Sequence, residues 1–152
     1  MAEAVLLKKI LEELTHNAEQ IRQEELEGFA DQIQRAKRVF VAGAGRSGFV
    51  ARAFSNRLMH LGLTVYFVGE PTTPAIQAGD LLIITSGSGE TGSLKVMAQK
   101  AKKQGAALAT ITIYPQASIG SLADAVITVP GSTPKSEFAD TEVSVQPMGN
   151  AF

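Results

Sequence analysis

Two segments of the chain share one design, in which a short apolar run passes through glycines into a helical pattern. The first run, VFVA at residues 39–42, continues as GAGRSG at 43–48. The second, LLIIT at 81–85, continues as SGSGETG at 86–92. Apolar, β-branched runs of this kind are typical of buried parallel strands. Two such units in one chain therefore favour an α/β fold built around a parallel sheet.

The glycine loops have the features of phosphate-binding loops. Glycine lets a backbone turn tightly and approach a ligand closely. The helix start behind each loop offers unpaired N–H groups and the positive end of the helix dipole. The hydroxyls of Ser47, Ser86, Ser88 and Thr91 add neutral donors for phosphate oxygens. The same hydroxyls also fit a structural role as helix N-caps, and one residue can do both.

The rest of the chain alternates between helical and strand patterns. Helical spacing of apolar residues from Leu7 to Ile21 predicts an N-terminal amphipathic helix, which fits either its own sheet or a partner subunit. The remaining pattern predicts helices at 24–35, 47–61, 92–104 and 119–123, and further strands at 64–68, 107–113 and 125–129. We expect one domain over residues 1–152, with an open, doubly wound parallel sheet of about five strands in a three-layer, flavodoxin- or Rossmann-like sandwich.

Composition excludes several functional classes. Apolar residues make up 45% of the chain and charged residues 19%, which excludes wholesale disorder. A net charge of −1 argues against nucleic acid as a partner. There is no cysteine, and His16 and His60 are the only histidines, so no metal site is expected. No apolar run approaches the roughly 20 residues that span a bilayer, so we expect a cytoplasmic protein without a membrane partner.

Three interpretations fit the loops. In the first, Gly43, Gly45 and Gly48 form the GxGxxG fingerprint of a dinucleotide site and Glu70 meets a ribose hydroxyl, but the second loop is unexplained. In the second, residues 86–91 bind flavin mononucleotide, although this loop follows the third strand and aromatic residues are only 6%. In the third, both loops converge on one small phosphorylated metabolite, because their strands are expected near the middle of the sheet.

The second loop also carries a family motif. Ser86, Ser88, Gly89 and Thr91 match the pattern Ser-x-Ser-Gly-x-Thr, and on it the chain resembles the sugar isomerase (SIS) domain family. The finer motifs are similar to its 6-phospho-3-hexuloisomerase branch: GAGRSG at 43–48, RLMH at 57–60, VGE at 68–70, SGSGET at 86–91 and QPMG at 146–149. This resemblance covers essentially the whole chain. It implies interconversion of D-arabino-3-hexulose 6-phosphate and fructose 6-phosphate, within formaldehyde fixation by the ribulose monophosphate pathway.

The resemblance also implies roles for particular residues. The expected substrate- and phosphate-binding residues are Gly45, Arg46, Ser47, Ser86, Gly87, Ser88, Gly89 and Thr91. His60 is the expected catalytic histidine, which stabilises the enediolate oxygen or shuttles protons. It acts within its own subunit or across a subunit boundary. Arg46 equally fits an ion pair at a subunit contact. No cofactor and no metal are implied, and the family usually assembles as a homotetramer.

The catalytic base is expected outside the sequence. In similar proteins the Gln-Pro-Met-Gly segment opens onto a helix with a glutamate, which would follow Phe152, so we expect the 152-residue form to be impaired. Glu90 is a second candidate for the base, although an acid at a helix start also complements the helix dipole. Glu70, Glu137 and Glu142 receive no role from the sequence. A sugar-phosphate-sensing module and SIS isomerases acting on arabinose 5-phosphate or sedoheptulose 7-phosphate are the alternative functions.

Overall fold

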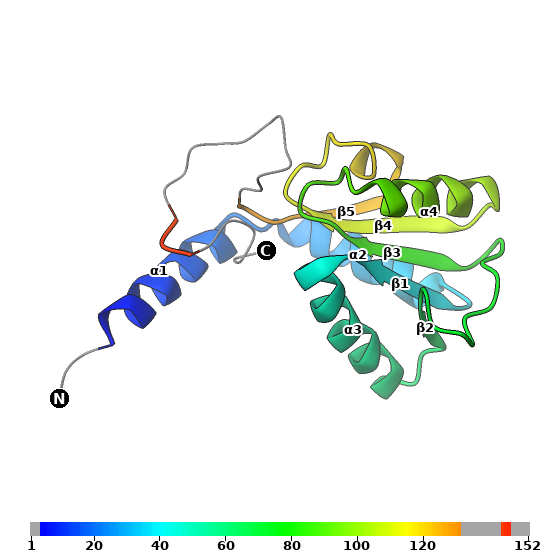
Figure 1. Ribbon diagram of the computed structural model, residues 1–152, viewed down its shortest axis with the longest axis horizontal. Helices are drawn as coiled ribbons and strands as arrows, with labels where there is room; N and C mark the ends of the chain where they lie inside the picture. The colour runs from blue at the N-terminus through cyan, green and yellow to red at the C-terminus, as the bar shows by residue number, and fades with distance from the viewer. Residues whose placement is uncertain (1–3, 132–143, 147–152) are drawn as a thin grey trace.

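The computed structural model describes residues 4–131 and 144–146 (Figure 1). Helices and strands alternate along most of the chain, as the sequence predicts. In chain order they are α1 (Val5–Glu19), α2 (Gln23–Arg35), β1 (Val39–Gly43), α3 (Gly45–His60), β2 (Val65–Phe67), β3 (Leu81–Thr85), α4 (Gly92–Lys103), β4 (Ala107–Thr112), the 3₁₀ helix η1 (Gly120–Leu122) and β5 (Ala125–Thr128).

The strands form one parallel sheet of five strands in the order β2-β1-β3-β4-β5. The predicted open parallel sheet is therefore confirmed, and most predicted element ends lie within two residues of the observed ones. The largest difference at a loop is at α3, which begins at Gly45 and not at residue 47. Its first turn thus contains three of the expected binding residues.

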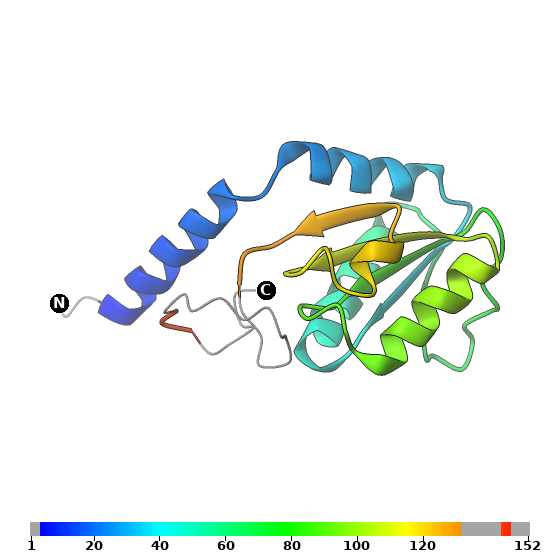
Figure 2. The same cartoon turned by 90° about the horizontal axis from the view of Figure 1, so that it is seen from above.

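Helices cover both faces of the sheet, which makes the fold doubly wound. Figure 2 shows α2 and α4 on opposite sides of the strands. Successive strand residues point to opposite faces. On one face, β1 and β3 side chains pack against α4 and η1 in a cluster that contains Phe40, Leu82, Ile84, Leu94, Ala98 and Ile119. On the other face, they pack against α2 and α3 in a cluster that contains Phe29, Val41, Ala51, Leu58 and Ile83.

The two N-terminal helices differ in how they contact the sheet. Helix α2 lies on the sheet beside β5, where Glu25 accepts a hydrogen bond from the Thr128 backbone N–H at 2.7 Å. Helix α1 extends away from the sheet (Figure 1) and has no buried residue. Its Val5, Leu6, Leu7, Leu11 and Leu14 are each 40–63% exposed. Within the described residues, therefore, α1 is not packed on its own sheet.

No helix in residues 4–131 or 144–146 combines the length and the apolar character needed to cross a membrane.

A charged pair joins the amino ends of β1 and β3. Arg38 Nε donates to Asp80 Oδ1 at 2.9 Å, and the Gln77 backbone N–H donates to Asp80 Oδ2 at 2.8 Å. The Asp80 carboxylate is buried, and the hydrogen bond from Arg38 holds its pKa below the usual range. Because a buried carboxylate without partners is costly, this pair fixes the edge of the sheet opposite the glycine loops.

Removing one partner of this pair should destabilise the fold. We expect Arg38→Met, which strands the buried Asp80 carboxylate, to lower the free energy of unfolding by about 3 kcal/mol, near the lower end for a broken buried pair. Because the folded pKa of Asp80 is depressed, this loss is full above the unfolded pKa of about 3.9 and shrinks as the pH falls below it. Urea unfolding monitored by circular dichroism measures the difference.

The matched control is Arg35→Met, which removes the exposed ion pair between Arg35 and Asp31. Such a pair is worth about 0.5 kcal/mol. Equal losses in the two variants would contradict the structural role assigned to the Arg38–Asp80 pair.

Candidate functional site

The two glycine loops lie side by side at the carboxyl edge of the sheet. Strands β1 and β3 are neighbours, and their last residues, Gly43 and Thr85, are paired. The Thr85 hydroxyl donates to the backbone carbonyl of Ser47 at 3.1 Å, which ties one loop to the other. From here the chain enters α3 on one face and α4 on the opposite face. This is the topological switch point of the sheet, where open α/β folds bind ligands.

Close packing explains two glycines of the first loop. A Cβ on Gly48 would lie 2.8 Å from the Gly43 carbonyl oxygen, and one on Gly43 would lie 2.5 Å from Thr85 Oγ1. The third glycine, Gly45, has a φ of +57° with open space around it, so its backbone conformation is what requires glycine. The GxGxxG pattern therefore brings the start of α3 close to β1, whatever ligand the loop binds.

The hydroxyls of Ser86 and Ser88 brace the second loop from inside. Ser86 Oγ accepts from the Gly89 N–H at 3.1 Å, and Ser88 Oγ accepts from the Glu90 N–H at 3.2 Å. Both side chains are buried. Each hydroxyl retains its own proton, which it can donate to a further acceptor such as a phosphate oxygen.

Of the four candidate N-cap residues, only Thr91 occupies an N-cap position, and its side chain makes no capping bond. Thr91 is the N-cap residue of α4 and makes no side-chain capping bond, while Ala44 occupies that position for α3. Ser47 lies within the first turn of α3. The serines of the loops are therefore not N-caps, and the hydroxyl of Thr91 is not engaged in capping.

A third loop, residues 113–119, joins the site, and the sequence analysis missed it. Glu90 Oε1 accepts from the Ser118 N–H at 2.6 Å, while Oε2 accepts from Ser118 Oγ at 2.9 Å and from Lys95 Nζ at 2.8 Å. These hydrogen bonds, that of Lys95 first, lower the pKa of Glu90 to about 2. The sequence could have indicated this loop by its position, because it follows β4, the strand beside β3 in the sheet.

His60 does not lie with the loops of its own chain. It is the exposed last residue of α3, whose first residue, Gly45, belongs to the first loop. From Gly45 to His60 the helix rises about 22 Å at 1.5 Å per residue. Within one chain the loops and the histidine are therefore at opposite ends of α3.

Two further charged residues lie near the loops. Arg46 is exposed in the first turn of α3. Glu70 follows β2 at the carboxyl edge of the sheet and forms an ion pair with Arg52, whose guanidinium lies 4.1 Å from the centre of the Phe67 ring.

Several expectations fall on residues that are not described, namely Glu137, Glu142 and the Pro-Met-Gly segment at 147–149. Among the described residues, no group of three or more His, Cys, Asp or Glu side chains could hold a metal ion.

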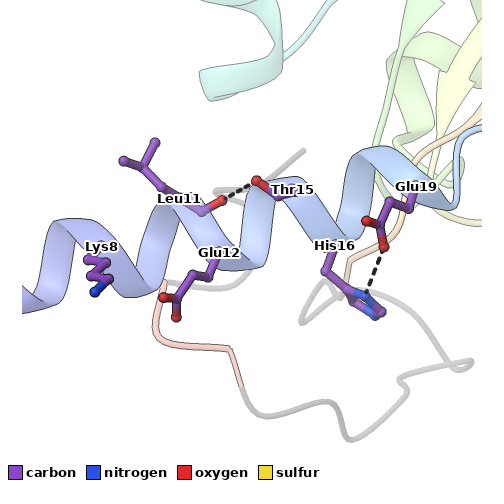
Figure 3. Close-up of a pocket in the computed structure, with 6 residues that line it drawn as sticks. All are labelled: Lys8, Leu11, Glu12, Thr15, His16 and Glu19. Atoms are coloured by element: carbon purple, nitrogen blue, oxygen red, sulfur yellow. Dashed lines mark hydrogen bonds and ion pairs between the residues drawn. The ribbon is translucent and has the colours of Figure 1, made fainter.

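A shallow pocket on α1 lies apart from the loops. Its lining residues all come from this one exposed helix: Lys8, Leu11, Glu12, Thr15, His16 and Glu19 (Figure 3). Two of the contacts within it are the Thr15 hydroxyl bond to the Leu11 carbonyl at 2.8 Å and the His16–Glu19 pair at 3.9 Å. His16 is exposed, and this pocket brings no expected site residue together.

Comparison with known proteins places the chain in a family. The family model described as SIS domain matches residues 32–148. The chain is 47% identical to a 3-hexulose-6-phosphate isomerase of Bacillus subtilis, over 95% of this chain and 77% of that protein. It is also 47% identical to one of Mycobacterium gastri, over 83% of this chain and 63% of that protein.

A solved structure has the same fold. It is a hypothetical protein of Methanococcus jannaschii for which the function of 3-hexulose-6-phosphate isomerase was inferred. The two are 42% identical with a TM-score of 0.67, over 73% of this chain and 63% of that one. The expected resemblance is thus confirmed: the chain belongs to the SIS domain family, and its relatives include proteins named 3-hexulose-6-phosphate isomerase.

Proposed function

We propose that this protein interconverts D-arabino-3-hexulose 6-phosphate and fructose 6-phosphate, the second step of formaldehyde fixation by the ribulose monophosphate pathway. The observation that carries the proposal is the pair of loops at the β1–β3 switch point, held together by the bond from Thr85 to Ser47. The isomerase names of its relatives support it. We place the protein in the cytoplasm.

In this proposal the phosphate binds between the two loops. Its ligands are the hydroxyls of Ser47, Ser86, Ser88 and Thr91, with backbone N–H groups at the starts of α3 and α4. Gly45, Gly87 and Gly89 let the backbone come close, and Arg46 contacts the sugar or the phosphate. Mostly neutral donors suit a small sugar phosphate, and the binding energy gained there positions the reacting carbons for proton transfer.

The chemistry moves the carbonyl group from C3 to C2. A base removes the proton from C2, hydrogen-bond donors stabilise the enediolate, a proton passes from the C2 oxygen to the C3 oxygen, and an acid returns a proton to C3. Such a base works best with a pKa near neutrality. A carboxylate with a pKa of about 2 is too weak a base for this task, which leaves Glu90 a poor candidate. We therefore do not assign the base to Glu90.

We further propose that His60 acts in the site of a partner subunit. It lies at the far end of α3 from the loops of its own chain, so only another copy can bring it to them. The exposed apolar residues of α1 offer a surface for such an assembly, since a lone helix of this length is marginal in water. A homotetramer is the assembly that we propose.

The direct test of the function is a coupled assay of the full-length protein. With D-arabino-3-hexulose 6-phosphate supplied, fructose 6-phosphate should appear and be detected by a coupled dehydrogenase. Tight binding of the hexulose phosphate without turnover would contradict the proposal and favour a sensing module. Preferred turnover of arabinose 5-phosphate or sedoheptulose 7-phosphate would assign another SIS isomerase activity.

Ser88→Ala tests the phosphate site. Loss of one hydrogen bond to a charged phosphate should lower kcat/KM about 10- to 100-fold. Ser55→Ala is the control, because its hydroxyl bonds to the Arg52 carbonyl within α3. An unchanged KM and kcat in Ser88→Ala would remove this residue from the phosphate site.

Mixing two impaired variants tests the placement of His60. Loss of an acid–base group should lower kcat about 10²- to 10⁴-fold in His60→Ala. If His60 serves the partner's loops, random reassembly of His60→Ala with Ser88→Ala should restore about a quarter of the sites in a symmetric pair. No recovery in mixed oligomers, verified by mass spectrometry, would place His60 in its own chain's site or outside catalysis.

A further inference from the structure

The loop proposed to bind phosphate, residues 86–91, contains a carboxylate, which carries the same sign of charge as the ligand. Glu90 lies between Gly89 and Thr91 in the segment proposed to hold phosphate. An acid there repels a phosphate unless its charge is compensated. Lys95 supplies the compensating charge, with its ammonium nitrogen 2.8 Å from Glu90 Oε2. The charge of Glu90 is therefore offset by a partner within the same short stretch of chain.

Both carboxylate oxygens of Glu90 accept hydrogen bonds within the protein, which does not suit a catalytic base. Oε1 accepts from the Ser118 N–H, and Oε2 accepts from the Ser118 hydroxyl and from Lys95. The arrangement connects residues that are 28 positions apart in the chain. Glu90 thus fastens the second loop to the third loop, residues 113–119.

Backbone contacts of the residues just before Glu90 make the same connection. The Ile119 N–H donates to the Gly89 carbonyl at 3.1 Å, and the Ile113 N–H donates to the Gly87 carbonyl at 3.1 Å. The two loops meet so closely that a Cβ on Gly89 would lie 2.7 Å from the Cβ of Ala117. Residues 86–91 therefore rest against the third loop along most of their length.

We propose that Glu90 is a positioning residue, which fastens the phosphate loop to residues 113–119 and so holds its hydroxyls and N–H groups in the geometry that binds phosphate. Preorganised donors bind more tightly because the cost of ordering them is met during folding. The inference rests on the phosphate site of the proposed function, but not on the identity of the sugar. Glu90 acts through the loop and does not contact the substrate.

The test compares Glu90→Ala with Glu90→Gln in the full-length protein. We expect Glu90→Ala to weaken binding of inorganic phosphate about tenfold in calorimetry and to raise KM similarly, with kcat within about twofold. Glu90→Gln should recover much of the binding, because its amide oxygen still accepts from the Ser118 N–H.

Asp124→Ala is the matched control. Asp124 also binds a lysine, Lys102 at 2.6 Å, and a backbone N–H, that of Leu108 at 2.8 Å, but it lies at the amino end of β4, away from the loops. Its removal should lower the melting temperature and leave phosphate binding unchanged.

Other outcomes would overturn the inference. A loss of kcat of about 10²-fold or more at constant KM in Glu90→Gln would make Glu90 the base. Unchanged phosphate binding in Glu90→Ala would leave Glu90 only a role in the stability of the fold. Tighter binding would mean that its charge mainly repels phosphate. A wild-type protein that binds phosphate but does not isomerise the hexulose phosphate would refute the proposed function alone, since the phosphate measurements would still test Glu90.

Discussion

The pairing of β1 with β3 is the constraint on which the candidate site depends. These neighbouring strands end at the paired residues Gly43 and Thr85, and their helices then leave toward opposite faces of the sheet. Two helix starts are thereby brought to one edge, each with N–H groups that lack partners inside the helix. Close packing of Gly43 against Gly48 keeps the start of α3 near the strand. A larger residue at Gly48 would push the start of α3 away from β1, and one at Gly43 would push the first loop away from Thr85.

Polar contacts are divided between the two edges of the sheet. At the amino edge, the Arg38–Asp80 and Lys102–Asp124 pairs hold strands and helices in place. At the carboxyl edge, Thr85 joins the first loop to the second, and Glu90 joins the second to the third. The carboxyl-edge contacts bind loop to loop, so they shape a site more than they stabilise the sheet. This division lets the loops carry function on a scaffold that is fixed elsewhere.

Much of the fold follows from local sequence pattern, and the longer-range contacts do not. The apolar runs at 39–42 and 81–85 predict buried strands because every side chain in them is apolar or β-branched. The glycines predict the loops because glycine adopts positive φ at little cost. Gly45 and Gly89 do adopt positive φ in the structure. By contrast, the Glu90–Ser118 contact joins segments whose proximity is set only by the order of β3 and β4. The separation of His60 from the loops follows from the length of α3. The exposure of α1 does not follow from its own sequence, because its amphipathic pattern does not say which surface it packs on.

The account rests on both loops holding one phosphate group. A crystal structure of the full-length protein with fructose 6-phosphate bound tests this most directly. The account predicts a phosphate at the β1–β3 switch point, within hydrogen-bonding distance of Ser47 or its neighbouring N–H groups and of residues 86–91. A phosphate bound by one loop alone, or bound elsewhere on the protein, would contradict it.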